Sequence, residues 1–317
     1  MKCHTFVLTA KKRPYTAQMS SDSNIDSNLW FWILGCLFTL LTVAGNGLVA
    51  YLILKKPQLQ TKPNCFIASL AVADIFVGIT YFPQILVKSF ICHSKQCDDV
   101  FFITRHFFQY SSNVNLCIML VDRHISVTKP LKHVTLMTTK RVTILLIASW
   151  TAPLFIFAIP QSIFLLFATE DQENAFSIFK TLVFSTLPMI LSIALTTSIL
   201  AVARSLSQEA RALNAQVRFN HRNDTLELNA SDSPAFERQR TAKMMIFVMV
   251  IFILCSAGEN WKGFCSRDWS LCCDEPKNVD HVLNLVCLLN SAANPIAYSF
   301  LKKDFKEQLK RLFQNRH

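Results

Sequence analysis

The residues of this sequence that could do chemistry are ionisable and polar side chains placed inside long apolar runs. Asp74 interrupts one run, Asp122 and Arg123 stand together at the end of another, and Asn294-Pro295 breaks the last. A charged group inside a bilayer costs on the order of several kcal/mol, so each of these residues is a candidate functional residue. The chemistry open to them is ion pairing and exchange of hydrogen-bond partners. The alternative is that they form permanent interhelical hydrogen bonds that hold a bundle together.

The sequence offers no covalent chemistry beside these runs. It lacks a nucleophile with a matched base and orienting group, a metal-ligating cluster and a phosphate-binding loop. His106 and His281 stand near one face of the apolar runs without a matched set of carboxylates. We therefore predict that the chain is not an enzyme, and we expect no cofactor apart from the ion considered below.

Apolar runs long enough to cross a membrane position these side chains. Of the 317 residues 51% are hydrophobic and 17% are charged, against about 25% charged in an average soluble domain. A transmembrane helix needs about 20 apolar residues. The sequence therefore predicts an all-α fold, a bundle of seven transmembrane helices followed by a short amphipathic eighth helix on the membrane surface. The seven runs are 29–54, 64–88, 97–127, 141–166, 176–203, 239–259 and 279–301.

Basic residues set the expected orientation. The net charge is +11, and the lysines and arginines gather in the segments that face the cytosol when the N-terminus lies outside. They form no single patch with interleaved aromatic residues, so no nucleic-acid partner is expected. We expect a multi-pass plasma-membrane protein with a cytoplasmic C-terminus. Its parts are an extracellular N-terminus at 1–28, a seven-helix domain at 29–301 with a third inner loop at about 205–236, and an amphipathic helix with a short tail at 302–317.

Six motifs in order make the resemblance to a family specific. They are Gly45-Asn46, Leu70-Ala-Val-Ala-Asp74, Asp122-Arg123-His124, Trp150, Pro188 and Asn294-Pro-Ile-Ala-Tyr298. From about residue 40 to 313 the chain resembles the rhodopsin-like (class A) G-protein-coupled receptors, nearest to their amine, trace-amine and melanocortin-like branch. The resemblance implies an extracellular small-molecule or peptide ligand, a heterotrimeric G protein and an arrestin as partners, surrounding membrane lipids, and an outer disulfide bond.

The resemblance also implies an activation switch. Arg123 would pair with Asp122 at rest and contact the G protein once helix six swings outward; a helix-end ion pair near water is cheap to break. The alternative is a static ion pair. His124 stands where the family more often has tyrosine, and Leu131 would insert into a groove of the G protein. The other implied switch residues are Pro188, Phe252, Asn294, Pro295 and Tyr298.

A sodium site is the second implication of the family. Five residues match its sodium pocket: Asp74, Ser112, Asn290, Ser291 and Asn294. Sodium is a hard cation that prefers oxygen ligands, and one carboxylate would otherwise lie unpaired among apolar residues. Sodium would favour the resting state. The alternative is a water-filled hydrogen-bond network without the ion.

Several residues depart from the family pattern. Helix six has Cys255-Ser-Ala-Gly258 in place of Cys-Trp-x-Pro, Thr196 replaces a tyrosine of helix five, and Asn113 replaces an apolar residue of helix three. Altered or weak signalling would follow. An atypical or decoy receptor therefore stays as an alternative, and a membrane transporter as a more distant one; a transporter would need inverted repeats and paired broken helices, which the sequence does not show.

The expected ligand site centres on Arg105, which stands where amine receptors carry an aspartate. A cationic amine would be repelled there, whereas a carboxylate or phosphate could be held in bidentate fashion. The alternatives are an internal ion pair, with Asp98, Asp99 or Glu259, and a side chain that reaches the surface. His106, Gln109 and Asn284 are the neighbouring candidates.

The family's disulfide cannot form in its usual place. Cys97 lies one residue from the expected position in helix three, but the second outer loop, at 167–180, contains no cysteine. The alternatives are a Cys92–Cys97 bond and pairs among Cys265, Cys272 and Cys273, because outer thiols meet an oxidising compartment.

Overall fold

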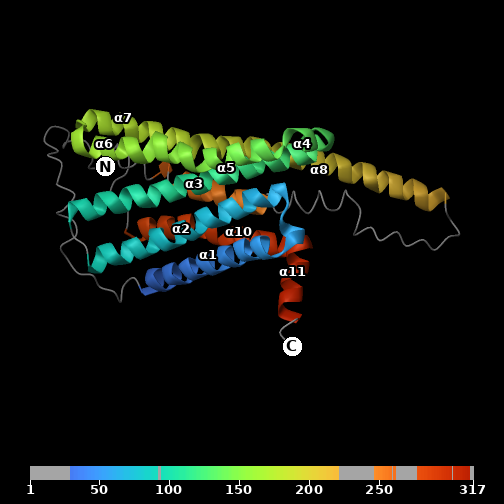
Figure 1. Ribbon diagram of the computed structural model, residues 1–317, viewed down its shortest axis with the longest axis horizontal. Helices are drawn as coiled ribbons and strands as arrows, with labels where there is room; N and C mark the ends of the chain where they lie inside the picture. The colour runs from blue at the N-terminus through green and yellow to red at the C-terminus, as the bar shows by residue number, and fades with distance from the viewer. Residues whose placement is uncertain are drawn as a thin grey trace, which may run out of the picture.

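A computed structural model describes residues 29–91, 94–220, 246–258, 260–261, 277–301 and 303–314. All the regular elements in these ranges are helices, and most of them lie side by side in one bundle (Figure 1). The expected all-α fold is confirmed for the described part. The expected extracellular segment 1–28 lies outside it, and so do residues 221–236 of the expected third inner loop.

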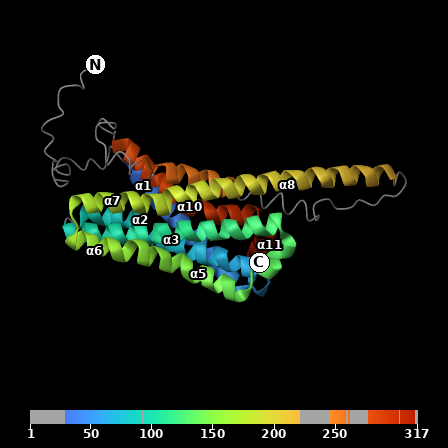
Figure 2. The ribbon, with the colours of Figure 1, turned by 90° about the horizontal axis from the view of Figure 1, so that it is seen from above.

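The first three membrane helices form one side of the bundle. α1 (Leu29–Lys55) is followed by the short turn η3 (Pro57–Leu59), α2 (Lys62–Phe90) and α3 (Lys95–Thr128). Each helix starts where the sequence supplies a suitable residue: Ser94 Oγ accepts from the Cys97 backbone N–H at 3.3 Å, and a proline stands in the first turn of α2. α1 packs against both α2 and α10 (Lys277–Leu301), which closes the bundle (Figure 2).

The fourth and fifth membrane helices each contain one π-helical turn. The fourth consists of α5 (Thr139–Pro153), η4 (Leu154–Ala158) and α6 (Ile159–Phe167), and the fifth of α7 (Glu170–Thr181), η5 (Leu182–Thr186) and α8 (Leu187–Asn220). Pro160 and Pro188 each follow such a turn by two residues. A proline has no N–H for the carbonyl four residues earlier and clashes with it, so the widened turn relieves the clash.

Two helices extend further than the sequence suggests. Residues 170–175, which the sequence places in the second outer loop alone, form the first half of α7, because the Thr169 N–H donates to Gln172 Oε1 at 3.0 Å and acidic residues favour a helix N-terminus. α8 continues to Asn220, into the expected inner loop 205–236, through a segment rich in Ala, Leu, Glu, Gln and Arg. These residues have high helix propensity, so the first part of the expected inner loop is helical.

Within the described residues, four helices are long and apolar enough to span a membrane on length and composition alone. They are 29–55, 62–87, 139–167 and 171–205; 246–258 is a shorter apolar helix. α3 and α10 also traverse the bundle, with polar side chains on their buried faces. α1 turns large apolar side chains such as Leu40 and Leu54 outward, 67% and 71% exposed, as a lipid-facing surface requires.

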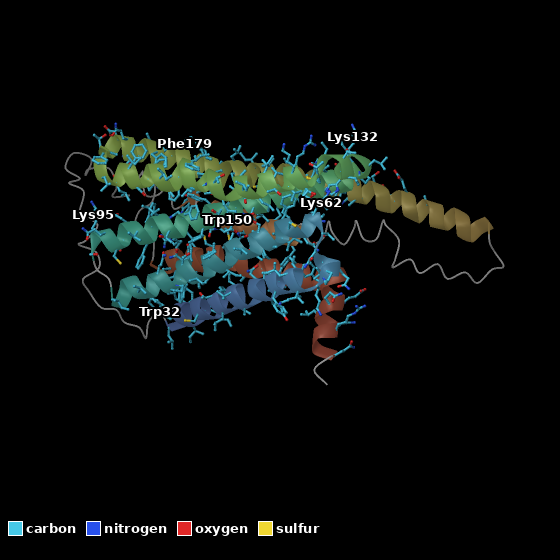
Figure 3. The ribbon with its side chains drawn as sticks, in the orientation of Figure 1. Trp32, Lys62, Lys95, Lys132, Trp150 and Phe179 are labelled. Atoms are coloured by element: carbon cyan, nitrogen blue, oxygen red, sulfur yellow. The ribbon has the colours of Figure 1, made fainter. Side chains whose placement is uncertain are left out.

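The short helices mark one end of the bundle, which we call the inner end; the opposite end is the outer end. α4 (Pro130–Leu136) and α11 (Lys303–Gln314) both lie at the inner end, and α11 runs across the direction of α10 (Figure 1). Phe305 of α11 is buried in the core cluster that contains Leu59 and Phe66, whereas Lys306 and Lys310 are exposed. This is the expected amphipathic eighth helix. Lys62 and Lys132 also lie at the inner end, and Lys95 at the outer end (Figure 3).

Candidate functional site

Asp74 is the centre of a buried polar network in the middle of the bundle. Its carboxylate is fully buried and accepts three hydrogen bonds. Ser112 Oγ of α3 and Ser291 Oγ of α10 donate to Oδ1 at 2.7 and 2.8 Å, and Asn294 Nδ2 donates to Oδ2 at 2.7 Å. Four of the five predicted ion-site residues are thus joined directly, and Asn290 is buried one helical turn away from Asn294 on α10.

The same network contains oxygen atoms that could serve a cation. The side-chain carbonyl oxygens of Asn290 and Asn294 are buried and have no hydrogen-bond partner among the described residues. With the Asp74 carboxylate and the hydroxyls of Ser112 and Ser291, they make the polar groups of this region rich in oxygen and give them one negative charge. Such a set suits a hard monovalent or divalent cation or ordered water. The residues present therefore fit the expected sodium ion.

Helix packing around Asp74 depends on small and amide residues. Asn46 Nδ2 donates to the backbone oxygen of Ser291 at 3.0 Å and so ties α1 to the α10 turn that carries the network. A Cβ on Gly45 would lie 3.0 Å from the Pro295 side chain, so glycine allows this close approach. Trp150 Nε1 donates to Ser69 Oγ at 3.1 Å, which joins α5 to α2 within the bundle (Figure 3).

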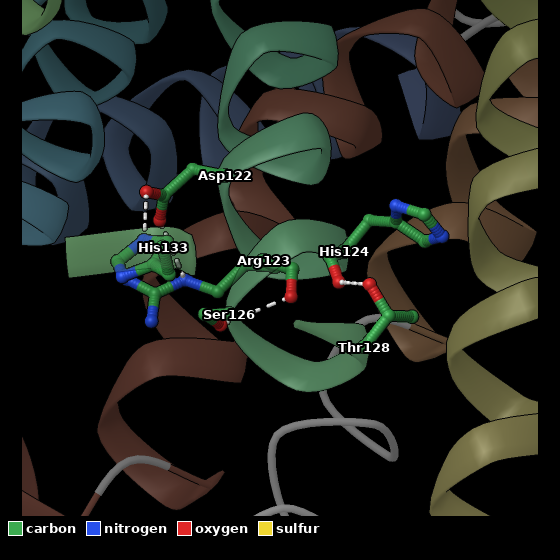
Figure 4. Close-up of polar contacts among 6 residues, drawn as sticks. All are labelled: Asp122, Arg123, His124, Ser126, Thr128 and His133. Atoms are coloured by element: carbon green, nitrogen blue, oxygen red, sulfur yellow. Dashed lines mark hydrogen bonds and ion pairs between the residues drawn. The ribbon is translucent and has the colours of Figure 1, made fainter. Parts of the chain in front are cut away.

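At the inner end Asp122 is held by two basic residues. Arg123 Nε lies 3.7 Å from Asp122 Oδ2, and His133 Nε2 lies 2.8 Å from Asp122 Oδ1 (Figure 4). The Asp122 side chain is 1% exposed. Arg123 Nε and Nη2 are buried and have no hydrogen-bond partner in the described part of the chain. Asp122 thus has its shorter contact with His133, while Arg123 keeps buried donor groups for another acceptor.

Sequence reasoning missed His133. It lies on α4, three residues after Pro130. The sequence shows a histidine in this short segment but does not show that the segment folds back on α3. His124 points the other way, with Nε2 2.9 Å from Ser198 Oγ of α8. Leu131 is 88% exposed at the inner end, where a partner protein could contact it.

The departures in helices three, five and six make polar contacts between helices. Asn113 Nδ2 donates at 3.1 Å to the backbone oxygen of Phe184, the carbonyl that Pro188 cannot serve. Ser185 Oγ donates to the Ser256 oxygen at 3.5 Å. The expected switch residue Phe252 is buried in the core cluster of the inner half.

Further contacts join the helix at 246–258 to α8 and α10. Thr196 Oγ1 lies 2.9 Å from Met249 Sδ, which joins α8 to the helix at 246–258. Cys255 Sγ lies 2.7 Å from the Val286 oxygen of α10. A Cβ on Gly258 would lie 2.8 Å from Leu283 Cδ2, so this position, where the family has proline, is tightly packed against α10. The Tyr298 side chain lies outside the described residues.

In the outer half Arg105 is stacked on an aromatic ring. Its guanidinium carbon lies 5.2 Å from the centroid of the Tyr81 ring, and Tyr81 Oη donates to Asn284 Oδ1 at 3.2 Å. Tyr81 thus links two of the predicted ligand residues, and sequence reasoning had counted it only as part of an apolar run. Gln109 is buried and donates to Asn113 Oδ1 at 3.4 Å.

His106 does not join Arg105 as the sequence suggested. Its Nδ1 lies 2.8 Å from the Phe102 oxygen, and its ring packs on Phe102, Tyr110 and Phe157. One helical step separates it from Arg105, and the 100° turn of that step directs the two side chains to different neighbours.

The outer cysteines are described only in part. Cys97 takes part in a disulfide bond. The other four predicted candidates, Cys92, Cys265, Cys272 and Cys273, lie outside the described residues. The pairing stays a prediction.

Comparison with known proteins shows which family has this sequence pattern. The sequence pattern of the seven transmembrane receptor (rhodopsin) family matches residues 45–298. An octopamine receptor beta-2R of Chilo suppressalis is 28% identical over 86% of this chain and 77% of its own length. The Drosophila melanogaster receptor of the same name is 25% identical, and this chain covers 61% of that protein. The trace amine-associated receptor 8b of Rattus norvegicus is 26% identical over 85% of this chain and 82% of its own length.

Proposed function

Because the chain belongs to the rhodopsin family of seven-transmembrane receptors, and is therefore a multi-pass membrane receptor and not an enzyme, we propose that it activates a heterotrimeric G protein when an extracellular ligand binds. The ligand would bind between the outer helix halves, with the N-terminus outside and the C-terminus in the cytosol. The observation that carries the proposal is the arrangement at the inner end, where Asp122 is clamped by Arg123 and His133.

We assign this clamp to the resting state of the receptor. Asp122 Oδ2 has no hydrogen-bond partner in the described part of the chain, and its 3.7 Å contact with Arg123 is a loose ion pair. A loose pair at a helix end costs little to separate, so a modest difference in ligand affinity between two conformations can shift the population. Arg123, once released, would contact the G protein, with Leu131 beside it. The other proposed switch residues, Pro188, Phe252, Asn294, Pro295 and Tyr298, connect this end to the middle of the bundle.

Sodium is the proposed allosteric ion of the resting state. Asp74, Ser112, Ser291, Asn290 and Asn294 would hold it through carboxylate, hydroxyl and amide oxygens. The two buried amide oxygens without partners support this proposal, because a buried polar atom without a partner is costly. Movement of α10 on activation would break up the oxygen set, which links ion release to receptor activation.

The proposed ligand is anionic. The compared receptors are named for octopamine and trace amines, but Arg105 here brings a positive charge to the outer half. The Arg105 guanidinium lies over the Tyr81 ring, and its N–H groups would bind a carboxylate or phosphate. Asn284, joined to Tyr81, and Gln109 would add neutral polar contacts; His106 would shape the site through its aromatic neighbours.

A receptor without G-protein signalling is the second candidate, and the helix-six contacts favour it. Ser256 and Gly258 replace the aromatic residue and the proline, and Gly258 packs tightly on Leu283. The helix at 246–258 would then stay packed against α10 and would not bend outward.

Nucleotide exchange separates the two candidates. Membranes with matched amounts of receptor and purified G protein are assayed for GTPγS binding, with Arg123→Ala as the test variant and Lys132→Ala, an exposed residue of α4, as the control. A signalling receptor loses its exchange activity in Arg123→Ala and keeps it in Lys132→Ala. If wild type and Arg123→Ala give equal nucleotide exchange with every G protein of a panel, the receptor without G-protein signalling is supported. An N-terminal epitope tag detected on intact cells tests the orientation.

A further inference from the structure

Lys180 of α7 places its charge in an aromatic setting at the outer end of the bundle. Its Nζ lies 4.6 Å from the centroid of the Phe102 ring and 5.9 Å from that of Phe157, and it donates a hydrogen bond to Gln161 Oε1 at 3.0 Å. We call Phe102, Phe157 and Gln161 the ammonium cage. Its three members come from α3, η4 and α6, and Lys180 reaches in from a fourth element.

The cage walls are fixed by contacts that do not involve Lys180. Phe157 is completely buried and meets Tyr110 edge-on at a centroid distance of 4.9 Å. The His106 ring packs against Phe102 at 4.2 Å and Phe157 at 6.1 Å. Gln161 is 6% exposed. Without the lysine side chain, the two ring faces and the amide oxygen would therefore keep their places.

These groups have the chemistry that recognises an ammonium ion. The ring faces of phenylalanine carry negative electrostatic potential, and a desolvated cation above them gains from it. The amide oxygen accepts one N–H bond, which fixes the direction of the head group.

We infer that the ammonium cage is a binding site for a primary ammonium ion and that Lys180 occupies it as a built-in ligand, so that the receptor excludes simple amines. The exclusion has two parts. Arg105 repels a cation on the α2 and α10 side of α3, and Lys180 fills the cation site on the α6 and α7 side. The receptors it was compared with are named for amines, whereas this chain supplies the amine from its own sequence. The inference does not depend on G-protein activation.

The test is a gain of binding in purified receptor. Wild type, Lys180→Ala and Lys180→Ser are titrated with n-propylammonium chloride in detergent micelles at constant ionic strength, and thermal unfolding is followed. The alanine and serine variants should be stabilised in a saturable way, and wild type should not. Phe102→Leu added to Lys180→Ala should raise the half-saturating concentration about tenfold, since one ring face is lost. Lys95→Ala, which removes an exposed lysine at the same end, is the matched control, and 1-propanol is the uncharged probe.

A second measurement uses the wild-type protein. Brief acetylation with an amine-reactive ester, read by mass spectrometry, should modify Lys180 more slowly than Lys95, and Phe102→Leu should remove part of this protection. Equal rates at Lys180 and Lys95 would overturn the occupied cage. So would folded Lys180 variants that do not respond to n-propylammonium, or a response of the same size in Lys95→Ala or with 1-propanol.

Discussion

Truncation of His133 should activate the receptor in the absence of ligand. The His133 Nε2 to Asp122 Oδ1 contact is 2.8 Å long and reaches a carboxylate that is 1% exposed. A hydrogen bond to a charged group contributes about 1.5–3 kcal/mol. If the contact exists only in the resting state, its loss in His133→Ala shifts the equilibrium toward the active state by roughly 10- to 150-fold, at tenfold for each 1.4 kcal/mol. A receptor that is about 1% active at rest would become about 10% active or more.

The assay is basal GTPγS exchange at matched receptor density. Lys132→Ala changes the neighbouring residue on the exposed face of α4 and should stay at the wild-type level, whereas His133→Gln, which keeps an N–H donor, should fall between wild type and His133→Ala. The reasoning fails if His133→Ala lowers thermal stability but leaves basal exchange unchanged, because His133 would then be a structural contact present in both states. A drop in basal exchange would refute it as well.

Three further results are expected. Asp74→Asn should abolish the rise in melting temperature that sodium chloride produces relative to choline chloride in purified wild type; a retained sodium effect would place the ion elsewhere. Arg105→Ala should weaken an anionic agonist about 10- to 100-fold at unchanged surface expression, measured by radioligand and surface labelling, since a charge-assisted contact is lost; equal potency would end the anionic-ligand proposal. Gly35→Ala should destabilise the receptor by about 1–3 kcal/mol, because the new Cβ would lie 1.9 Å from Phe82 Cε2; a melting temperature equal to that of wild type would contradict this packing.

The partners of polar residues in the membrane helices could be predicted because few positions of the bundle can supply the hydrogen bonds that these residues need. An aspartate such as Asp74 in an apolar run needs donors from other helices, and helix periodicity restricts which side chains can face it. Ser112, Ser291 and Asn294 were named because they match the family's sodium pocket, and the structure joins them to Asp74.

The contacts that the sequence did not predict depend on where short or irregular segments turn. His133 reaches Asp122 only because α4 folds back on α3, and polar residues between apolar runs carry no signal for such a turn. Lys180 stands where the expected outer loop 167–180 and the expected apolar run 176–203 overlap, and its cage appears only once α7 continues the fifth membrane helix outward. Tyr81 was indistinguishable from its apolar neighbours, since hydropathy does not show which of them meets a charge.

The hydrogen bond from Asn113 to the Phe184 carbonyl lies at the π-turn in the middle of the fifth membrane helix. Pro188 has no N–H to donate to this carbonyl, and the Asn113 side chain of α3 donates to it. The segment bearing Lys180 and the segment bearing Ser198, the contact of His124, lie on opposite sides of the turn. A rotation of one segment against the other would have to exchange this one amide contact, whereas the regular helix on either side of the turn would stay intact.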